Sequence, residues 1–159
     1  MASEAIEEAL ALRARESDVE IGTDASRLDL DMIHAFLTGS YWAAGIPREV
    51  LERAVRHSLC FGAYLAGRQV GFARVISDRA TFAYVSDVFV LPSERGRGVG
   101  GRLMAAIMAH PDLQGLRRWI LMTRDAHGLY EKSGFRTIQD PSRCMEIVDR
   151  DVYTRRGPG

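Results

Sequence analysis

A glycine-rich stretch between a predicted strand and a predicted helix constrains the fold of this chain more than any other feature. Four of the six residues from 96 to 101 are glycine, and two arginines lie in or beside the stretch. The glycines are Gly96, Gly98, Gly100 and Gly101, and the arginines are Arg95 and Arg97. Glycine lets a backbone approach a ligand closely, and the start of a helix presents unpaired N–H groups with a partial positive charge. The stretch therefore predicts a phosphate or pyrophosphate site, although a tightly packed turn has the same spacing.

Two nucleotide-binding loops do not account for the stretch. A Walker loop requires Gly-Lys-Ser/Thr, and Gly101-Arg102-Leu103 has neither the lysine nor the hydroxyl. The spacing Gly96-x-Gly98-x-x-Gly101 matches the dinucleotide fingerprint, which also needs an acidic residue about twenty positions later on the next strand. Residues 119–122, the predicted strand in that place, carry no carboxylate. The dinucleotide match is therefore weak.

The rest of the chain shows helical periodicity first, then an antiparallel meander, then alternating strands and helices. Strands are predicted at residues 19–21, 60–65, 69–76, 81–91, 119–122, 135–138 and 145–148, and helices at 29–37, 47–59, 99–109 and 126–133. Asp29 and Asp125 are the expected N-caps, and Gly39 and Gly134 the expected helix ends. The order predicts an α+β domain over residues 19–150. Residues 1–18 are expected to form a short helix, an arm or a dimer contact, and residues 151–159 a disordered tail.

Charge and cysteine content argue against several classes of function. The 21 basic and 21 acidic residues give a formal charge of zero, whereas nucleic-acid binders usually show a basic excess. Cys60 and Cys144 are too few for a disulfide framework or a zinc cluster, so no metal is expected. No apolar run approaches the roughly 20 residues that cross a bilayer, and no leader segment is evident. We therefore expect a cytoplasmic protein that acts without nucleic acid or membrane.

Two motifs together resemble the GNAT superfamily of acyl-CoA-dependent N-acyltransferases. Arg95-x-x-Gly98-x-Gly100 is similar to the family's loop between a central strand and a helix, and Tyr130-x-x-x-Gly134-Phe135 to its later helical motif. The resemblance extends over about residues 19–148. It implies a mixed, largely antiparallel central sheet flanked by helices. Its fourth and fifth strands, residues 81–91 and 119–122, would splay into a V that holds acetyl-CoA.

The resemblance also implies where acetyl-CoA binds. The amides of residues 95–101, which are Arg95, Gly96, Arg97, Gly98, Val99, Gly100 and Gly101, would bind the pyrophosphate. The backbone of Val88, Phe89 and Val90 would pair with the pantetheine arm like an added strand. Thr123 stands where the family often has an asparagine that helps to hold the pantetheine, so this contact would be weaker here.

The implied reaction is acetyl transfer to a primary amine by direct attack in a ternary complex. An alkylammonium, with a pKa near 10, must lose a proton before it attacks, and the departing thiolate gains from a proton donor. The matched motif makes Tyr130 the expected general acid, and a purely structural aromatic is the alternative. Asp87 is equally a candidate base or a structural hydrogen-bond acceptor, His127 is a weaker base, and a water relay remains open.

The acceptor side of the implied site rests on three aromatic residues. Tyr41, Trp42 and Tyr84 are the candidate substrate-binding residues, because the family builds its acceptor pocket from the first helical loop and the central strands. The acceptor would be a small molecule or a peptide amine, and a homodimer is possible. A module that binds acyl-CoA without turnover is the alternative function.

Overall fold

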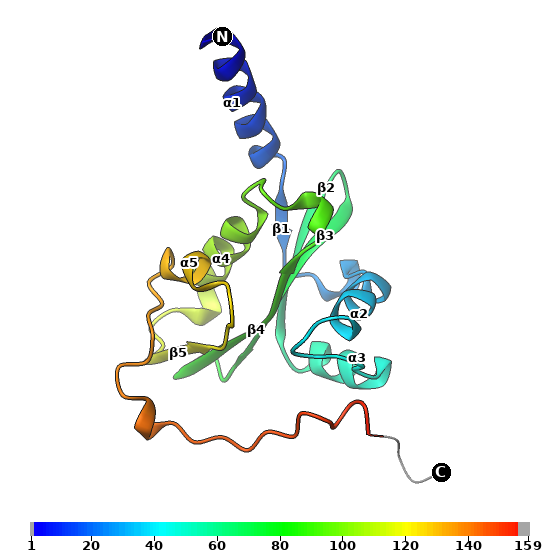
Figure 1. Ribbon diagram of the computed structural model, residues 1–159, viewed down its shortest axis with the longest axis vertical. Coiled ribbons are helices and arrows are strands. Elements are labelled where there is room, and N and C mark those ends of the chain that lie inside the picture. Colours follow the sequence, from blue (N-terminus) through cyan, green and yellow to red (C-terminus); the bar gives the residue numbers. More distant parts are fainter. Residues whose placement is uncertain (1, 156–159) are drawn as a thin grey trace.

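The computed structural model describes residues 2–155, and for Ala2 and residues 12–17 it describes the backbone only (Figure 1). The helices are α1 Ala2–Ser17, α2 Leu30–Thr38, α3 Arg48–Arg56, α4 Val99–Ala109 and α5 His127–Glu131. The strands are β1 Glu20–Gly22, β2 Leu59–Leu65, β3 Arg68–Ser77, β4 Phe82–Val90 and β5 Arg118–Leu121. Short 3-10 turns lie at Ala25–Arg27, Pro92–Glu94, Pro111–Leu113 and Pro141–Arg143. From α2 to α5, the order of helices, meander and alternating elements is the predicted one.

The sheet has the order β1-β2-β3-β4-β5 in the described residues. Strands β1 to β4 are antiparallel, and β5 runs parallel to β4. The β4–β5 pairing begins at Phe82 with Arg118 and stops at Val85 with Leu121. Beyond Val85, β4 continues to Val90 without a neighbouring strand on that side among the described residues. The mixed, largely antiparallel sheet with diverging fourth and fifth strands is therefore confirmed.

Helices cover both faces of the sheet and create two apolar layers (Figure 1). Between the sheet and α4, one cluster includes the fully buried Val75, Leu103 and Ile107. On the other face, α2 and α3 pack Leu37 and Leu51 against the sheet. Each fully buried aliphatic side chain of this kind contributes roughly 1.5–3 kcal/mol to folding. The site described below lies where β4 and β5 separate between these layers.

The helix ends follow the sequence signals in most places. The Asp29 side chain accepts from Met32 N at 3.0 Å and caps α2, and Gly39 ends it. The expected cap of the last helix is wrong: Ala126, not Asp125, is the N-cap of α5. Instead, Ala126 N donates to Thr123 Oγ1 at 3.0 Å, and this bond fixes the turn before the helix. Asp125 is thereby left at the tip of the turn, where it cannot cap the helix.

The two closing strands predicted at residues 135–138 and 145–148 are wrong. The described residues there form no strand, and the chain runs past β5 towards α2 and α3 (Figure 1). Phe135 packs edge-on against Trp119 and Tyr130, whereas Met145 and Ile147 are almost wholly exposed, at 98% and 104%. The alternation of apolar residues does fit a strand, but a strand also needs a hydrogen-bonding neighbour that local sequence does not specify.

The two ends of the chain differ in how they meet the domain. Helix α1 projects away from it in Figure 1, with Ile6 and Leu10 each 60% exposed. At the other end, we expected a disordered tail, and the structure describes residues 151–155 as a turn. Arg155 N donates to Asp151 O at 2.8 Å there, and Tyr153 packs against the α2–α3 cluster. Residues 156–159 of the expected tail lie outside the described residues.

Candidate active site

A β-bulge in β4 determines which side chains reach the site. The register pairs Arg74 with Ser86 and Phe72 with Phe89, so Asp87 and Val88 together oppose one residue of β3. Asp87 has a φ of +53°, which aspartate tolerates better than most residues do. The extra residue inverts the alternation of the strand. Val85 packs on the α4 side, and Phe89, four positions later, packs on the α2–α3 side.

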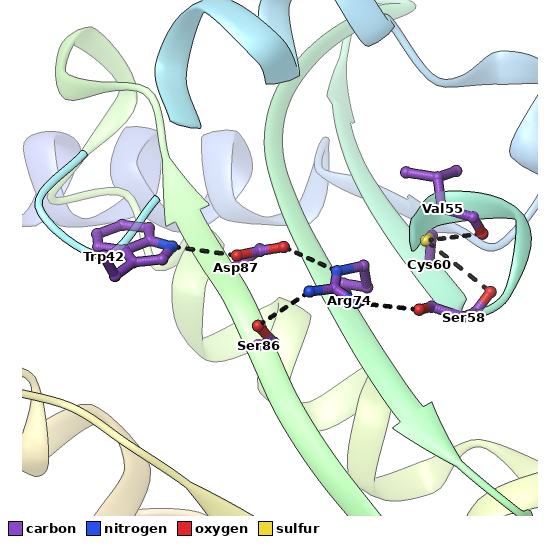
Figure 2. Close-up of polar contacts among 7 residues, drawn as sticks. All are labelled: Trp42, Val55, Ser58, Cys60, Arg74, Ser86 and Asp87. Carbon is purple, nitrogen blue, oxygen red and sulfur yellow. Dashed lines mark hydrogen bonds and ion pairs between the residues drawn. The ribbon is translucent and has the colours of Figure 1, made fainter. Parts of the chain in front are cut away.

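Asp87 is held in this conformation by a polar network (Figure 2). Its Oδ2 accepts from Arg74 Nε at 2.7 Å, and its Oδ1 accepts from Trp42 Nε1 at 3.1 Å. Arg74 also donates to Ser58 Oγ at 3.2 Å and to Ser86 Oγ at 3.3 Å. The side chains of Asp87 and Arg74 are only 7% and 14% exposed. The network therefore ties the bulge to β3 and to the loop after α2.

The glycine-rich loop leads into α4 with its first amides open. Gly98 is the N-cap of α4, with a φ of +73° and no side-chain cap. The bond from Arg102 N to Gly98 O, at 3.1 Å, is the first of the helix, so the amides before it have no partner within the helix. Glu94, 7% exposed, pairs with Arg68 at 2.8 Å and with Arg97 at 3.0 Å, which offsets its charge beside this loop. The geometry fits the phosphate site that the sequence predicts.

A single cleft of about 1130 Å³ connects the loop with the gap between β4 and β5. One wall is the exposed edge of β4 with the loop and the start of α4, and another is the turn before α5 with α5 itself. Aromatic residues from α2 and the loop after it close the cleft. The lining residues used below are Phe36, Tyr41, Trp42, Val88, Phe89, Val90, Arg95, Gly100, Arg124, Asp125, Leu129 and Tyr130.

Tyr130 is the phenol of this cleft. It lies on α5, is 9% exposed, and packs edge-on against Phe135. Burial raises the pKa of the Tyr130 phenol above its usual value, and the neighbouring Tyr41 and Asp125 raise it further. Tyr130 therefore keeps its proton at neutral pH. No hydrogen bond engages its hydroxyl within the part of the chain that the structure describes, so the proton is available to a ligand.

Comparison with known proteins identifies the family. Residues 56–137 match the family described as "Acetyltransferase (GNAT) domain", which is about half of the chain. The chain belongs to the GNAT acetyltransferase family. A protein of Gibberella zeae, whose name gives acetyltransferase as a provisional function, is 36% identical over 139 residues, 73% of this chain and 77% of the relative.

Solved structures described as acetyltransferases share the fold. A provisionally named GNAT acetyltransferase from Xanthomonas campestris pv. campestris is 54% identical, with a TM-score of 0.84, over 86% of this chain and 97% of that one. A Clostridium acetobutylicum protein described as a predicted acetyltransferase, and crystallised with acetyl-CoA, is 12% identical with a TM-score of 0.61, over 82% of this chain and 96% of that one. The second likeness shows the fold alone.

Most of the residues that the GNAT resemblance singled out meet at the cleft. The lining includes Tyr41, Trp42, Tyr130, the β4 residues 88–90 and, from the loop, all the candidates except Arg97. Arg95 also donates from Nε to Val90 O at 3.1 Å, so this carbonyl already has a partner. The bulge explains why Val88 and Val90 face the cleft side, because it reverses the alternation after Asp87.

Five candidates do not line the cleft: Tyr84, Asp87, Arg97, Thr123 and His127. Tyr84 lies within the β4–β5 pairing, before the strands separate. Thr123 accepts from Ala126 N, and this use of its hydroxyl differs from the expected pantetheine contact. Of the two roles that the sequence left open for Asp87, the geometry favours the hydrogen-bond acceptor, because both of its oxygens already have donors.

Sequence reasoning missed several residues of the GNAT cleft. Phe36 stacks on Phe89 with ring centroids 3.9 Å apart, and Arg124 lies over the ring of Tyr41. Phe36 has ordinary helical spacing, so nothing in the pattern distinguishes it from a core residue. Arg124 had a usable signal, because it lies in the short segment between the fifth strand and the Tyr130 motif, where the strands separate.

Proposed function

We propose that this GNAT protein transfers the acetyl group of acetyl-CoA to a primary amine by direct attack in a ternary complex. The observation that carries the proposal is that one cleft joins the open amides at the start of α4 to the uncommitted hydroxyl of Tyr130. The first feature suits the pyrophosphate of a CoA ester. The second suits proton transfer to a leaving thiolate.

Acetyl-CoA, as a substrate, fits the cleft by the chemistry of its walls. The loop amides and the positive end of α4 would bind the pyrophosphate, because both favour an anion. Beyond Val85, no described strand pairs with β4 on the cleft side, so this edge offers backbone groups to the amides of the pantetheine arm. The backbone at Gly100 remains accessible, because the nearest atoms to a Cβ there would be the ends of Leu129 at 3.6 Å.

The transfer step needs one proton removed and one delivered. The neutral amine attacks the thioester carbonyl carbon, a C–N bond forms, and the C–S bond breaks as the electron pair leaves on sulfur. Tyr130 donates its proton to that sulfur and is reprotonated from solvent, which gives free CoA. The proton lost by the amine passes to water, because Asp87, one candidate base, lies outside the cleft lining with both oxygens engaged. His127 does not line the cleft either.

Product analysis tests the proposal against the alternative of a non-catalytic acyl-CoA sensor. The purified protein is incubated with acetyl-CoA and a panel of amines, and acetylated amines are measured by mass spectrometry. Mass spectrometry is preferable to a thiol reagent because Cys144 is exposed and would add a background signal. We expect an acetylated amine and CoA in equal amounts. Calorimetric binding of acetyl-CoA without product from any amine would contradict transfer and favour the sensor.

A further inference from the structure

Arg124 and Asp125 form the tip of the turn between β5 and α5, and both line the cleft. The turn is fixed at its base by the bond from Ala126 N to Thr123 Oγ1 at 3.0 Å. It is fixed again at its far side by the bond from Leu129 N to Ala126 O at 3.1 Å. A cation and an anion adjacent in sequence are therefore presented to the cleft from a fixed backbone.

The Arg124 guanidinium rests on a chain of contacts that reaches the sheet. Its Cζ lies 3.8 Å from the centroid of the Tyr41 ring. Tyr41 meets Trp42 edge to face at 5.1 Å, and Trp42 donates to Asp87, which is ion-paired with Arg74. Although Tyr41 and Trp42 are 51% and 42% exposed, these contacts hold their side chains in place. Arg124 thus rests on a platform of packed rings in the lining of the same cleft as Tyr130.

The charge of Arg124 has no partner among the described residues, since none of their carboxylates forms an ion pair with it. A guanidinium that stacks on a ring leaves its N–H groups pointing outward in its own plane. This is the arrangement that binds a carboxylate through two parallel hydrogen bonds. The loop cations differ in this respect, because Arg97 pairs with Glu94 and Arg95 donates to Val90 O.

We propose that the acceptor is a small amine that carries its own carboxylate, of the amino-acid class, and that Arg124 binds this carboxylate. The inference rests on the proposed acetyl transfer and specifies its second substrate. Asp125 would attract the ammonium form of the acceptor to the region of Tyr130 before the proton is lost to water. Phe36 and Trp42 form an aromatic wall, with their ring centroids 6.3 Å apart. This wall would receive an apolar or aromatic side chain of the acceptor.

Matched pairs of acceptors test the proposal. Apolar and aromatic amino acids are compared with their carboxamides, which keep the amine and the side chain but lack the anion. We expect kcat/KM to be at least about tenfold higher for the free acid of the best pair. The comparison is conservative, because the amine of the carboxamide is less basic and more of it is neutral near pH 7.5. Equal use of acid and carboxamide would overturn the inference and leave acetyl transfer intact.

Variants of Arg124 test whether this residue causes the preference for the free acid over the carboxamide. Arg124→Gln should reduce the acid-to-carboxamide ratio to one or below, through a higher KM for the acid, while KM for acetyl-CoA stays unchanged. Arg124→Lys should retain only part of the ratio, because an ammonium lacks the planar fork. Arg117→Gln is the matched control, an exposed arginine just before β5 and outside the cleft lining, and should keep the full ratio. A ratio unchanged in Arg124→Gln would refute the role of Arg124.

A binding measurement keeps the test decisive if no amine is turned over. Calorimetric titration of the same amino acids into the protein saturated with CoA should show binding in the parent and none in Arg124→Gln. That result would support the carboxylate site even if transfer were absent. No binding by the parent, together with no turnover, would overturn the inference.

Discussion

Replacing Asp87 by asparagine separates a structural role of this residue from a catalytic one. Asparagine also tolerates the positive φ of the bulge and can still accept from Trp42, so the change removes mainly the charge opposite Arg74. The two side chains are 7% and 14% exposed, so Arg74 would be left as a nearly buried, uncompensated cation. Breaking a buried pair in this way costs about 3–5 kcal/mol, and the retained Trp42 bond places the expected loss near the lower end, about 3 kcal/mol.

Urea unfolding measures this loss. With an m-value of about 1–3 kcal/mol/M, the midpoint of Asp87→Asn should fall by about 1–3 M. The double variant Asp87→Asn/Arg74→Gln should be more stable than Asp87→Asn alone, because it also removes the unpaired charge. A free energy of unfolding for Asp87→Asn within about 0.5 kcal/mol of the parent would refute the reasoning.

Activity measurements complete the distinction. Under conditions in which the variant is folded, Asp87→Asn should keep the ascending limb of the pH–rate profile. If Asp87 were the general base, its replacement would lower kcat by about 10²–10⁴ and flatten that limb. That second outcome would return Asp87 to the catalytic role that the geometry disfavours.

Three further predictions concern the loop, the thiols and the pH dependence. Gly100→Val should weaken acetyl-CoA binding at least about tenfold in calorimetry, because a side chain would stand between the loop amides and the pyrophosphate. Gly128→Val, where a Cβ would meet nothing within 4 Å, is the control, and equal affinities would count against the loop as the CoA site. Near pH 8 a disulfide reagent should react with one thiol in the native protein, the exposed Cys144, and with two after unfolding. Cys60 should not react in the native protein, because burial raises the pKa of its thiol to about 12. Reaction of both thiols in the native protein would contradict the burial of Cys60. The transfer rate should rise with pH as the acceptor amine becomes neutral. At any pH below about 10 the profile should show no descending limb, because burial raises the pKa of the acid Tyr130 above its usual value. A descending limb near pH 8 would show that another group is the acid.

Local sequence patterns predicted those parts of the fold whose causes are local. The four glycines before α4 and the apolar spacing of Val99, Leu103 and Ile107 specify the loop and its helix without reference to the rest of the chain. Asp29 likewise caps α2 because its partner amide is three residues away. The loop residues other than Arg97, and Tyr130, whose motif is also local, lie in the cleft lining for the same reason.

The errors arose where distant residues decide the structure. The bulge at Asp87 depends on Arg74 and Trp42, so the pattern of β4 alone did not show that the strand alternation reverses. The strand predicted at residues 145–148 depends on a neighbouring strand that the described sheet does not supply. The local position of Arg124 signals a place near the cleft but not its contact with the ring of Tyr41, which is 83 positions earlier in the chain and only 3.8 Å from Cζ.

Turnover of Tyr130→Phe tests the central claim most directly. The substitution keeps the ring that packs against Phe135 and removes only the hydroxyl of this cleft-lining residue. Steady-state rates with the best acceptor are measured together with the calorimetric affinity for acetyl-CoA, for the parent and for the variant. The account predicts that kcat falls by about 10²–10⁴ while the affinity for acetyl-CoA changes little. Full activity in Tyr130→Phe would contradict it, because the proton for the leaving thiolate would then come from another source.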